Sequence, residues 1–531
     1  MIKPIQTSIT AHDQTQLQTV FNYKLLTKEG GHSPKVQSYT VDAFLFFPPQ
    51  LAINHKTYSK DDFYEDIRPY LRFNAPKYTY NEFLGKKNRK KQKVYSPYSR
   101  IKTLLRQIKK GQAFSADDAI REVHFFACVF HKFIAERADR RCKKILAGYE
   151  HSVDLTLEFN ITESFMKRGH KILKAWYELT EAFQVKDEKT AQMAQEMLYA
   201  GEYCFFVFLE GMTSFGHAIR HFKETSDVLL FKRKIRALSR LYHHVALRRG
   251  FQLVDKDSTM KDLENFSLHM RGLKRRMWQV LFLDVEQTKT VVVKQQLAYM
   301  VAAGFSAIWA LMANLFIWRE LQFTGYQTKG AADSFLGYGG AVIAVAFIVA
   351  YVLQDRIKEI GRNRFLGRVF KRADTNKHIW YHTSESDRKS VGTIEERTSF
   401  LSRSHPLRQE IEKYRKTQMS TNTAFDEKMI HYQKKINFSE KNLRESPYPL
   451  VAVRDIIRLN VNRYVARMDD PTKEFIMMTS MGEVRKIQIP KVYNIDMVLK
   501  YTYKEDSDSL EKTFLETKRL ILNKNGLVRV E

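Results

Sequence analysis

Two long runs without a charged side chain constrain this sequence more than any other feature. The first, LAYMVAAGFSAIWALMANLFIW, extends from Leu297 to Trp318, and the second, FLGYGGAVIAVAFIVAYVL, extends from Phe335 to Leu353. An α-helix rises about 1.5 Å per residue, so a hydrocarbon layer of about 30 Å takes about 20 apolar residues to cross. A helix in a soluble core normally keeps a polar stripe toward water. The runs predict a transmembrane hairpin, and the alternative is a pair of helices buried in a soluble core.

Basic residues surround this pair of runs on its outer sides. The connecting segment RELQFTGYQTKGAADS carries only Arg319 and Lys329, which Glu320 and Asp333 balance. The flanking basic residues are Arg271, Lys274, Arg275, Arg276, Lys289 and Lys294 before the first run, and Arg356, Lys358, Arg362, Arg364, Arg368, Lys371 and Arg372 after the second. Lys and Arg are enriched in cytoplasmic flanks of membrane helices. We therefore expect a multi-pass protein with both termini in the cytoplasm.

The composition is otherwise that of a protein with large soluble parts. The chain has 531 residues and a formal net charge of +29, so the molecule as a whole attracts anions such as nucleic acid or anionic lipid headgroups. Its aromatic fraction of 13% argues against extended disorder. Cys128, Cys142 and Cys204 are too few for a disulfide framework or a four-cysteine zinc site. A reducing compartment suits these cysteines.

Three kinds of periodicity divide the chain. Apolar residues alternate through 21–25 and 39–47, which predicts an antiparallel hairpin. Residues 98–285 repeat apolar side chains at three- and four-residue spacing, and Ser115 and Asp187 are placed to cap helices there, as Ser59 is for a short helix before them. After residue 371 a polar stretch leads to strand-like runs such as EVRKIQIP and RLILNKNGLVRV.

These patterns predict an α+β membrane protein. The expected parts are an N-terminal β-hairpin-containing segment with a basic loop (1–95), a cytoplasmic helical bundle (96–290), a two-helix transmembrane hairpin (291–355, with spans 297–318 and 335–353) and a C-terminal cytoplasmic domain rich in antiparallel β-strands (356–531). The N- and C-terminal strands could belong to one sheet, which the sequence alone leaves open.

The densest basic run is KKNRKKQK, and it is the candidate for contact with an anionic surface. Its charged residues are Lys86, Lys87, Arg89, Lys90, Lys91 and Lys93. Lys and Arg at this density neutralise phosphates, and near a membrane each contributes about 1 kcal/mol of attraction to anionic headgroups. Three readings stay open: a solvated loop, contact with lipid headgroups, and contact with nucleic acid, which is the least favoured.

Other clusters have simpler explanations. FKRKIRALSRLYHHVALRR, residues 231–249, is an amphipathic helix that we expect to pack in the bundle rather than on a membrane surface. His217 and His221 with Glu210 have a spacing that could place a metal on a helix, but three or four ligands with supporting hydrogen bonds are needed. No standard catalytic motif occurs, so we assign no catalytic, cofactor or metal residues and leave enzymatic activity open.

Two stretches of the sequence resemble an uncharacterised group of bacterial two-span inner-membrane proteins. The stretches are TVDAFLFFPPQLAINHKTYSKDDFYEDIRPYLRFNAPKYT, residues 40–79, and YVLQDRIKEIGRNRF, residues 351–365. The resemblance implies a bacterial inner membrane and no particular chemistry or site residues.

The function that these observations favour is non-enzymatic. We expect a membrane-anchored scaffold or sensor that binds a cytoplasmic protein partner, because the chain has much folded mass and no recognisable catalytic motif. The alternatives are an enzyme of unrecognised type that acts on a membrane-associated substrate and an oligomeric pore-forming effector. The expected partners are the lipid bilayer, anionic headgroups, a cytoplasmic protein and further copies of the same chain.

Overall fold

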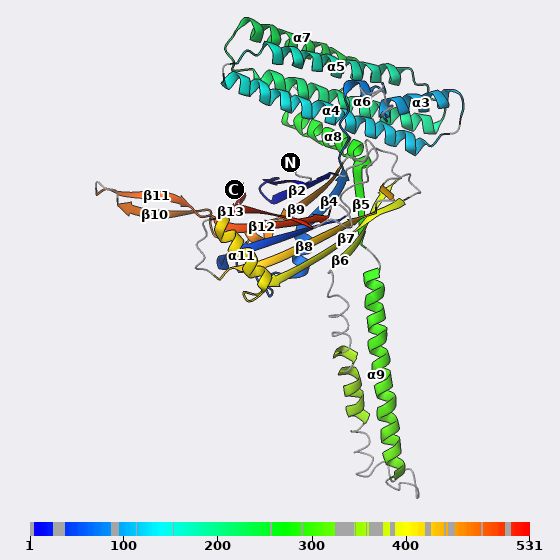
Figure 1. Cartoon of the computed structure of the whole chain (residues 1–531), viewed down its shortest axis with the longest axis vertical. Helices are drawn as coiled ribbons and strands as arrows, with labels where there is room; N and C mark the ends of the chain where they lie inside the picture. Colours follow the sequence, from blue (N-terminus) through cyan, green and yellow to red (C-terminus); the bar gives the residue numbers. More distant parts are fainter. Residues whose placement is uncertain are drawn as a thin grey trace.

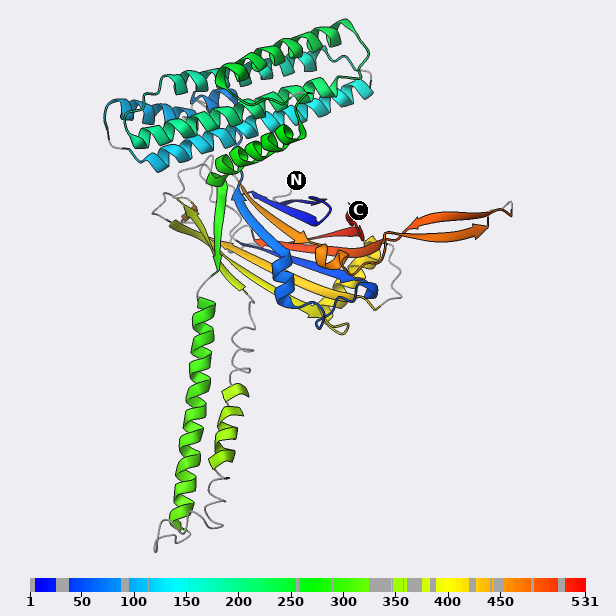
Figure 2. The ribbon, with the colours of Figure 1, turned by 180° about the vertical axis from the view of Figure 1, so that it is seen from behind.

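The structure is a computed structural model. It describes residues 5–24, 38–86, 95–112, 114–151, 153–254, 257–287, 290–323, 345, 347–356, 358–360, 375–382, 388–419, 426–439, 442–443, 452–478, 482–504 and 511–531. Figure 1 and Figure 2 show three parts: a layer of long helices, a strongly curved sheet beneath it, and one long helix that leaves the sheet on the side away from the helical layer.

Within the described residues the main sheet has twelve strands, all paired antiparallel. Their order is β1-β2-β9-β4-β5-β6-β7-β8-β3-β12-β13-β14. The bounds are β1 (Ile5–Ala11), β2 (Gln16–Lys24), β3 (Ser38–Phe47), β4 (Ile67–Phe73), β5 (Phe282–Gln287), β6 (Thr375–His382), β7 (Arg388–Leu401), β8 (Lys428–Phe438), β9 (Ala452–Asn460), β12 (Tyr493–Lys504), β13 (Lys512–Asn523) and β14 (Gly526–Val530).

The sheet curves into a nearly closed barrel. Its two end strands meet, since Leu527 N at the start of β14 donates to Gln14 O in the β1–β2 turn at 2.7 Å, and Thr7 Oγ1 on β1 donates to Glu516 Oε2 on β13 at 2.6 Å. The positive φ of Gly526, 126°, belongs to this junction, where a Cβ would lie 2.3 Å from Gln14 O. Closing a sheet in this way pairs most of its exposed edges.

Apolar side chains fill the inside of the barrel, and a second, smaller cluster covers part of its outer face. On β3, Tyr39 and Val41 face inward, whereas Phe44 and Phe46 pack outward under α11 (Pro406–Gln418). Short helices α1 (Lys60–Asp66), α2 (Tyr80–Phe83) and α13 (Asn462–Val465) lie in connections between strands. The predicted cap of α1 is confirmed, because Ser59 and Asp62 form a reciprocal capping box.

Six helices form the layer above the barrel. They are α3 (Pro97–Lys109), α4 (Ala116–Glu150), α5 (Thr156–Glu181), α6 (Glu188–Ala218), α7 (Ser226–Arg249) and α8 (Met260–Trp278). Ser115 and Asp187 accept backbone hydrogen bonds as the predicted caps of α4 and α6. The layer joins the barrel where Arg72 on β4 stacks over Trp278, with its guanidinium carbon 4.4 Å from the ring centroid.

The predicted C-terminal β-rich domain is wrong. The barrel is built from strands before the helical layer, one strand between that layer and α9, and strands after residue 374. β3 lies between β8 and β12, and β2 pairs with β9. The alternation of apolar residues was read correctly as strands. This alternation does not show which strand lies next to which, because any strand of matching length can cover an apolar face.

The predicted two-helix transmembrane hairpin, and with it the predicted fold class, is also wrong. In the described part of the chain, one helix is long and apolar enough to cross a membrane: α9 (Thr290–Phe323), of whose window Tyr299–Phe316 only 11% is buried. Of the second predicted span, 335–344 and Ala346 lie outside the described residues. The absence of charged residues predicts that a segment is apolar, but it does not by itself predict that the segment forms a membrane-spanning helix.

The described remainder of the second run is helical and lies beside α9. Phe347 and Tyr351 line a cavity of about 400 Å³ together with Ala310 and Asn314 of α9. The pairing of β5 with β6 brings the chain back to the barrel after this excursion, since Asp284 lies opposite Trp380. The end of β5 and the beginning of β6 therefore lie next to each other in the barrel.

Candidate functional site

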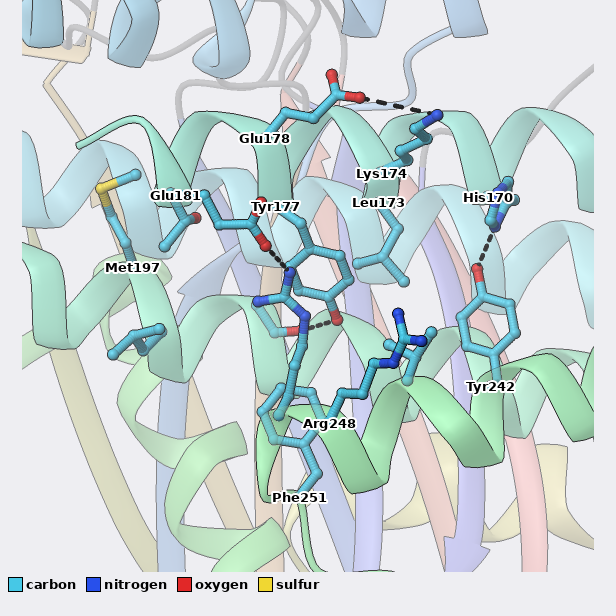
Figure 3. Close-up of a pocket in the computed structure, with 15 residues that line it drawn as sticks. His170, Leu173, Lys174, Tyr177, Glu178, Glu181, Met197, Tyr242, Arg248 and Phe251 are labelled. Atoms are coloured by element: carbon cyan, nitrogen blue, oxygen red, sulfur yellow. Dashed lines mark hydrogen bonds and ion pairs between the residues drawn. The ribbon is translucent and has the colours of Figure 1, made fainter.

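A groove between α5, α6 and α7 is the candidate functional site. Its volume is about 680 Å³, within the range of about 300–1,000 Å³ typical of ligand pockets. Figure 3 shows side chains from all three helices converging on it. Apolar or aromatic residues form much of its lining, namely Leu173, Tyr177, Met197, Tyr242, Val245 and Phe251. The charged residues that line it are Lys174, Glu178, Glu181, Arg248 and Arg249.

The end of α7 shapes one side of the groove. α7 terminates at Gly250, whose φ of 69° is a left-handed conformation that favours glycine. The next backbone amide, that of Phe251, then bonds to Ala246 O at 3.0 Å. This tight end turns the Phe251 ring back toward α6, where its centroid lies 5.2 Å from that of Phe205.

Arg249 and Tyr177 hold the opposite walls together. The Arg249 guanidinium donates to Glu181 Oε1 at 2.5 Å, and its central carbon lies 3.6 Å from the centroid of the Tyr177 ring. The Tyr177 hydroxyl donates in turn to the backbone oxygen of Gly201 on α6 at 3.3 Å. Three helices are thus linked by one chain of contacts, which makes the groove a preformed feature.

His170 and Tyr242 close the other end of the groove. His170 Nδ1 and the Tyr242 hydroxyl share a hydrogen bond of 2.7 Å (Figure 3). Burial lowers the pKa of His170 and raises the pKa of Tyr242, because both charged forms are poorly solvated there. Both side chains are therefore neutral near pH 7.

The exposed surface of α7 beside the groove carries a stripe of unpaired basic residues, which we call the α7 stripe. Its members recur at helical spacing and are exposed: Arg233, Arg236, Arg240, His243 and Arg248. None of them has an ion-pair partner among the described residues, whereas Lys232 and Lys234 of the same helix pair with Glu224 and Glu163. The leucines 230, 241 and 247 are exposed on α7 as well. The stripe is an amphipathic, cationic surface.

The α7 stripe lies far from α9. In both Figure 1 and Figure 2, α7 occupies the outermost position of the helical layer, while α9 leaves the barrel on the opposite side of the molecule. A bilayer crossed by α9 would therefore be separated from the α7 stripe by the barrel and the helical layer. This geometry argues against the lipid surface as its counterpart.

The basic run predicted as an anionic contact is mostly outside the described residues. Lys86 is described and exposed after α2, whereas Lys87, Arg89, Lys90, Lys91 and Lys93 are not among the described positions. Its role stays a prediction.

The 231–249 helix was expected from the sequence to pack in the bundle rather than on a membrane surface. The sequence does contain the signal for the α7 stripe, since arginines at 233, 236 and 240 share a face that carries no acidic residue.

The histidines considered as metal ligands do not converge. α6 ends at Ala218, so His217 lies in its last turn and His221 lies beyond it, where its ring accepts a hydrogen bond from Arg220 Nε at 2.6 Å. Within the described residues, no three His, Cys, Asp or Glu side chains are arranged to hold a metal ion.

A second concentration of charge lies inside the barrel. Lys434 Nζ is 2.7 Å from Asp455 Oδ1, and Tyr39 donates to the other oxygen of that carboxylate at 3.2 Å. Next to them, Glu396 accepts from Tyr432 at 2.7 Å and also contacts Lys377. The side chains of Lys434, Asp455 and Glu396 have no exposed surface, so we assign the network to stability.

The sequence contained a signal for the buried lysine. On β8 the side chains of Ile430, Tyr432, Lys434 and Ile436 share one face of the strand, since alternate residues point the same way. A lysine on the apolar face of a strand is an indication of a buried partner, and the partner here is on a strand that is not adjacent.

Comparison of the chain with known proteins returned no matching family model, no matching curated protein and no matching solved structure.

Proposed function

We propose that this protein is a membrane-anchored scaffold or sensor whose helical layer binds an acidic, amphipathic segment of a cytoplasmic protein. The observation that carries the proposal is the unpaired α7 stripe beside an apolar groove, on the side of the molecule away from α9. The groove supplies apolar contact area, and the arginines supply charge complementarity, which mainly increases association rate and specificity.

Attachment to a membrane rests on α9. Its described side chains between Tyr299 and Phe316 are almost all exposed although most are apolar, which in water would carry a large free-energy cost. A bilayer crossed by α9 would have the barrel and the helical layer on the same side (Figure 1). The resemblance to bacterial proteins favours the inner membrane, with that side in the cytoplasm.

An acidic protein segment fits the surface better than nucleic acid does. Leu241 and Leu247 lie exposed among the arginines, and the groove next to them is lined by Leu173, Met197 and Val245. Apolar contacts of this kind match the leucine face of an amphipathic helix. Single-stranded nucleic acid is bound instead by exposed aromatic rings on which bases stack, and the Phe231 and Tyr242 rings of α7 are both buried.

A binding measurement with a defined probe tests the proposal. The probe is a fluorescent synthetic peptide that forms an amphipathic helix with leucines on one face and glutamates on the other, mixed with the full-length protein in detergent. We expect saturable binding that weakens as salt is added, because the arginines are exposed and screened. A scrambled peptide of the same composition, which lacks the apolar face, should bind more weakly.

Charge-reversal variants test whether the α7 stripe is the surface that binds the peptide. Arg240→Glu with Arg248→Glu should weaken peptide binding by about tenfold or more, which corresponds to about 1.4 kcal/mol. Arg271→Glu, at an exposed position of α8, is the matched control and should bind as the wild type does. Equal binding by the double variant would refute the proposed surface. Tight binding of a single-stranded oligonucleotide by the wild type, with no binding of the peptide, would refute the proposed partner class.

A further inference from the structure

A two-stranded arm projects from the barrel, and nothing in the described chain covers it. The arm, residues Thr472–Met478 (β10) and Val484–Pro490 (β11), forms a sheet of its own. Every residue of both strands is exposed. Figure 1 and Figure 2 show it extending sideways from the barrel, across the direction in which α9 runs. An isolated two-stranded hairpin is at best marginally stable in water, so this arm needs a partner.

One face of the arm is apolar at its centre. The register places Phe475 opposite Ile487, Lys473 opposite Ile489 and Met477 opposite Arg485. Residues that face each other in this way point to the same side of the sheet. Phe475, Met477, Ile487 and Ile489 therefore form a contiguous apolar surface with Lys473 and Arg485 at its two ends, which we call the Phe475 face. On the other side, Glu474 and Lys486 form an ion pair of 3.2 Å at the centre, and the exposed apolar residues Ile476, Met478 and Val484 lie toward the tip.

We propose that the arm is a homodimerisation element, and that two copies of this chain exchange arms about a two-fold axis with the Phe475 face of each arm buried on its neighbour. The size of the arm supports a reciprocal arrangement. Seven residues at about 3.3 Å each make it about 23 Å long, and with a width and thickness of about 10 Å its lateral surface is about 900 Å².

Burying half of that surface removes about 450 Å² from the arm and a similar area from the surface that receives it. One such contact buries about 900 Å² in total, which falls short of the range of about 1,200–2,000 Å² for specific interfaces, whereas two exchanged arms bury about 1,800 Å². The area therefore favours mutual exchange over a single contact. A closed two-fold pair also avoids the open chains that a head-to-tail contact would produce.

The direction of the arm favours a second copy over the bilayer as its partner. The arm leaves the barrel at the level of the sheet, while α9 points away from it (Figure 1). Copies held in one membrane by α9 would have their arms at equal height, and confinement to the same membrane raises the effective concentration for pairing. This inference uses none of the groove residues, so it stands or falls independently of the proposed binding function.

The test is the mass of the full-length protein in detergent, measured by light scattering with the detergent contribution subtracted. We expect twice the 62.5 kDa of one chain for the wild type. Phe475→Ser with Ile487→Ser should raise the dissociation constant at least about tenfold and give monomers, since both residues lie at the centre of the buried face. Glu474→Gln with Lys486→Gln, on the opposite face, is the matched control and should remain dimeric.

A labelling experiment keeps the proposal falsifiable if the serine variant loses its fold. In otherwise unchanged protein, a thiol introduced by Phe475→Cys should react with a maleimide at least about tenfold more slowly than one introduced by Ile476→Cys, which points to the other face. A monomeric wild type, a serine variant that stays dimeric, or equal labelling of the two thiols would each overturn the proposal. The proposal would also fail if the Phe475→Cys thiol became protected only when lipid vesicles were added, because the bilayer would then be the partner.

Discussion

The ammonium group of Lys434 on β8 and the carboxylate of Asp455 on β9 lie 2.7 Å apart, and neither side chain has any exposed surface. In the order of the sheet, β8 and β9 are separated by β4, β5, β6 and β7. The ion pair therefore crosses the inside of the barrel rather than joining neighbouring strands. It links the half of the barrel that holds β9 to the half that holds β8.

Removing one member of this ion pair should lower the free energy of unfolding. Lys434→Met leaves the Asp455 carboxylate buried, where burial already raises its pKa although Lys434 lowers it. We expect a loss of about 3–5 kcal/mol in the free energy of unfolding, as for other broken buried pairs. Urea unfolding in detergent measures it. Lys435→Met, at the next and exposed position, is the control and should change stability by less than about 0.5 kcal/mol.

Removing both charges should cost much less than removing one. In the double variant Lys434→Met with Asp455→Leu, no uncompensated charge is left, and apolar replacements of buried pairs are often neutral or stabilising. A double variant as unstable as Lys434→Met alone would show that the barrel depends on the shape of these two side chains rather than on their charges.

Glu122 on α4 should make stability depend on pH. Burial raises the pKa of this carboxyl from 4.5 to about 7, although a hydrogen bond from Tyr95 opposes the shift. The unfolded chain loses this proton at a lower pH than the folded protein does, so its contribution to stability falls as pH rises from about 4.5 to about 7 and is unfavourable above that range. The full difference is about 3–4 kcal/mol.

The variant Glu122→Gln should remove this dependence of stability on pH. The variant should be more stable than the wild type at about pH 8 and similar to it near pH 4, which thermal unfolding at the two pH values can measure. Glu150→Gln, at an exposed position of the same helix, serves for comparison and should leave both midpoints unchanged. A Glu122→Gln protein that gains nothing at high pH would contradict the assignment.

Two glycines should respond in opposite ways to alanine. At Gly392 on β7 an added Cβ would lie 2.3 Å from the backbone oxygen of Asn437 on β8, so the strands would have to separate, and we expect a loss of about 2 kcal/mol or more. At Gly272 on α8 nothing lies within 4 Å, and alanine should stabilise the helix by about 0.5–1 kcal/mol. If the thermal unfolding midpoints of the Gly392→Ala and Gly272→Ala variants moved in the same direction, this explanation would be excluded.

Charges on α9 should impair membrane attachment. Ile308 and Met312 are both exposed near the middle of the apolar window, and an arginine there costs about 2.5–3.5 kcal/mol per residue on insertion scales. Ile308→Arg with Met312→Arg should therefore reduce the fraction of protein in the membrane pellet after ultracentrifugation. Leu230→Arg, at an exposed position of α7, should not. If wild-type protein stayed in the supernatant without detergent, α9 would not be an anchor.

Local features of this protein could be predicted from its sequence. Ser59, Ser115 and Asp187 were recognised as helix caps, and the structure confirms each, because a cap depends on residues within one turn. The apolar run at 297–318 was recognised as a long helix for the same reason. The candidate groove was not, because its lining comes from three helices, and nothing local relates Tyr177 to Gly201 and Arg249.

By itself, the sequence determined which segments are helix or strand and which face of each is apolar, since periodicity and capping act over a few residues. Only the tertiary structure decided which strands are neighbours and which charges meet. Tyr39, Lys434 and Asp455 come from three strands spread over 416 positions of the chain, and they share a network because the sheet closes on itself. Alternating apolar residues along a strand show that one of its faces must be buried. Which strand covers that face is decided by the packing of the whole barrel.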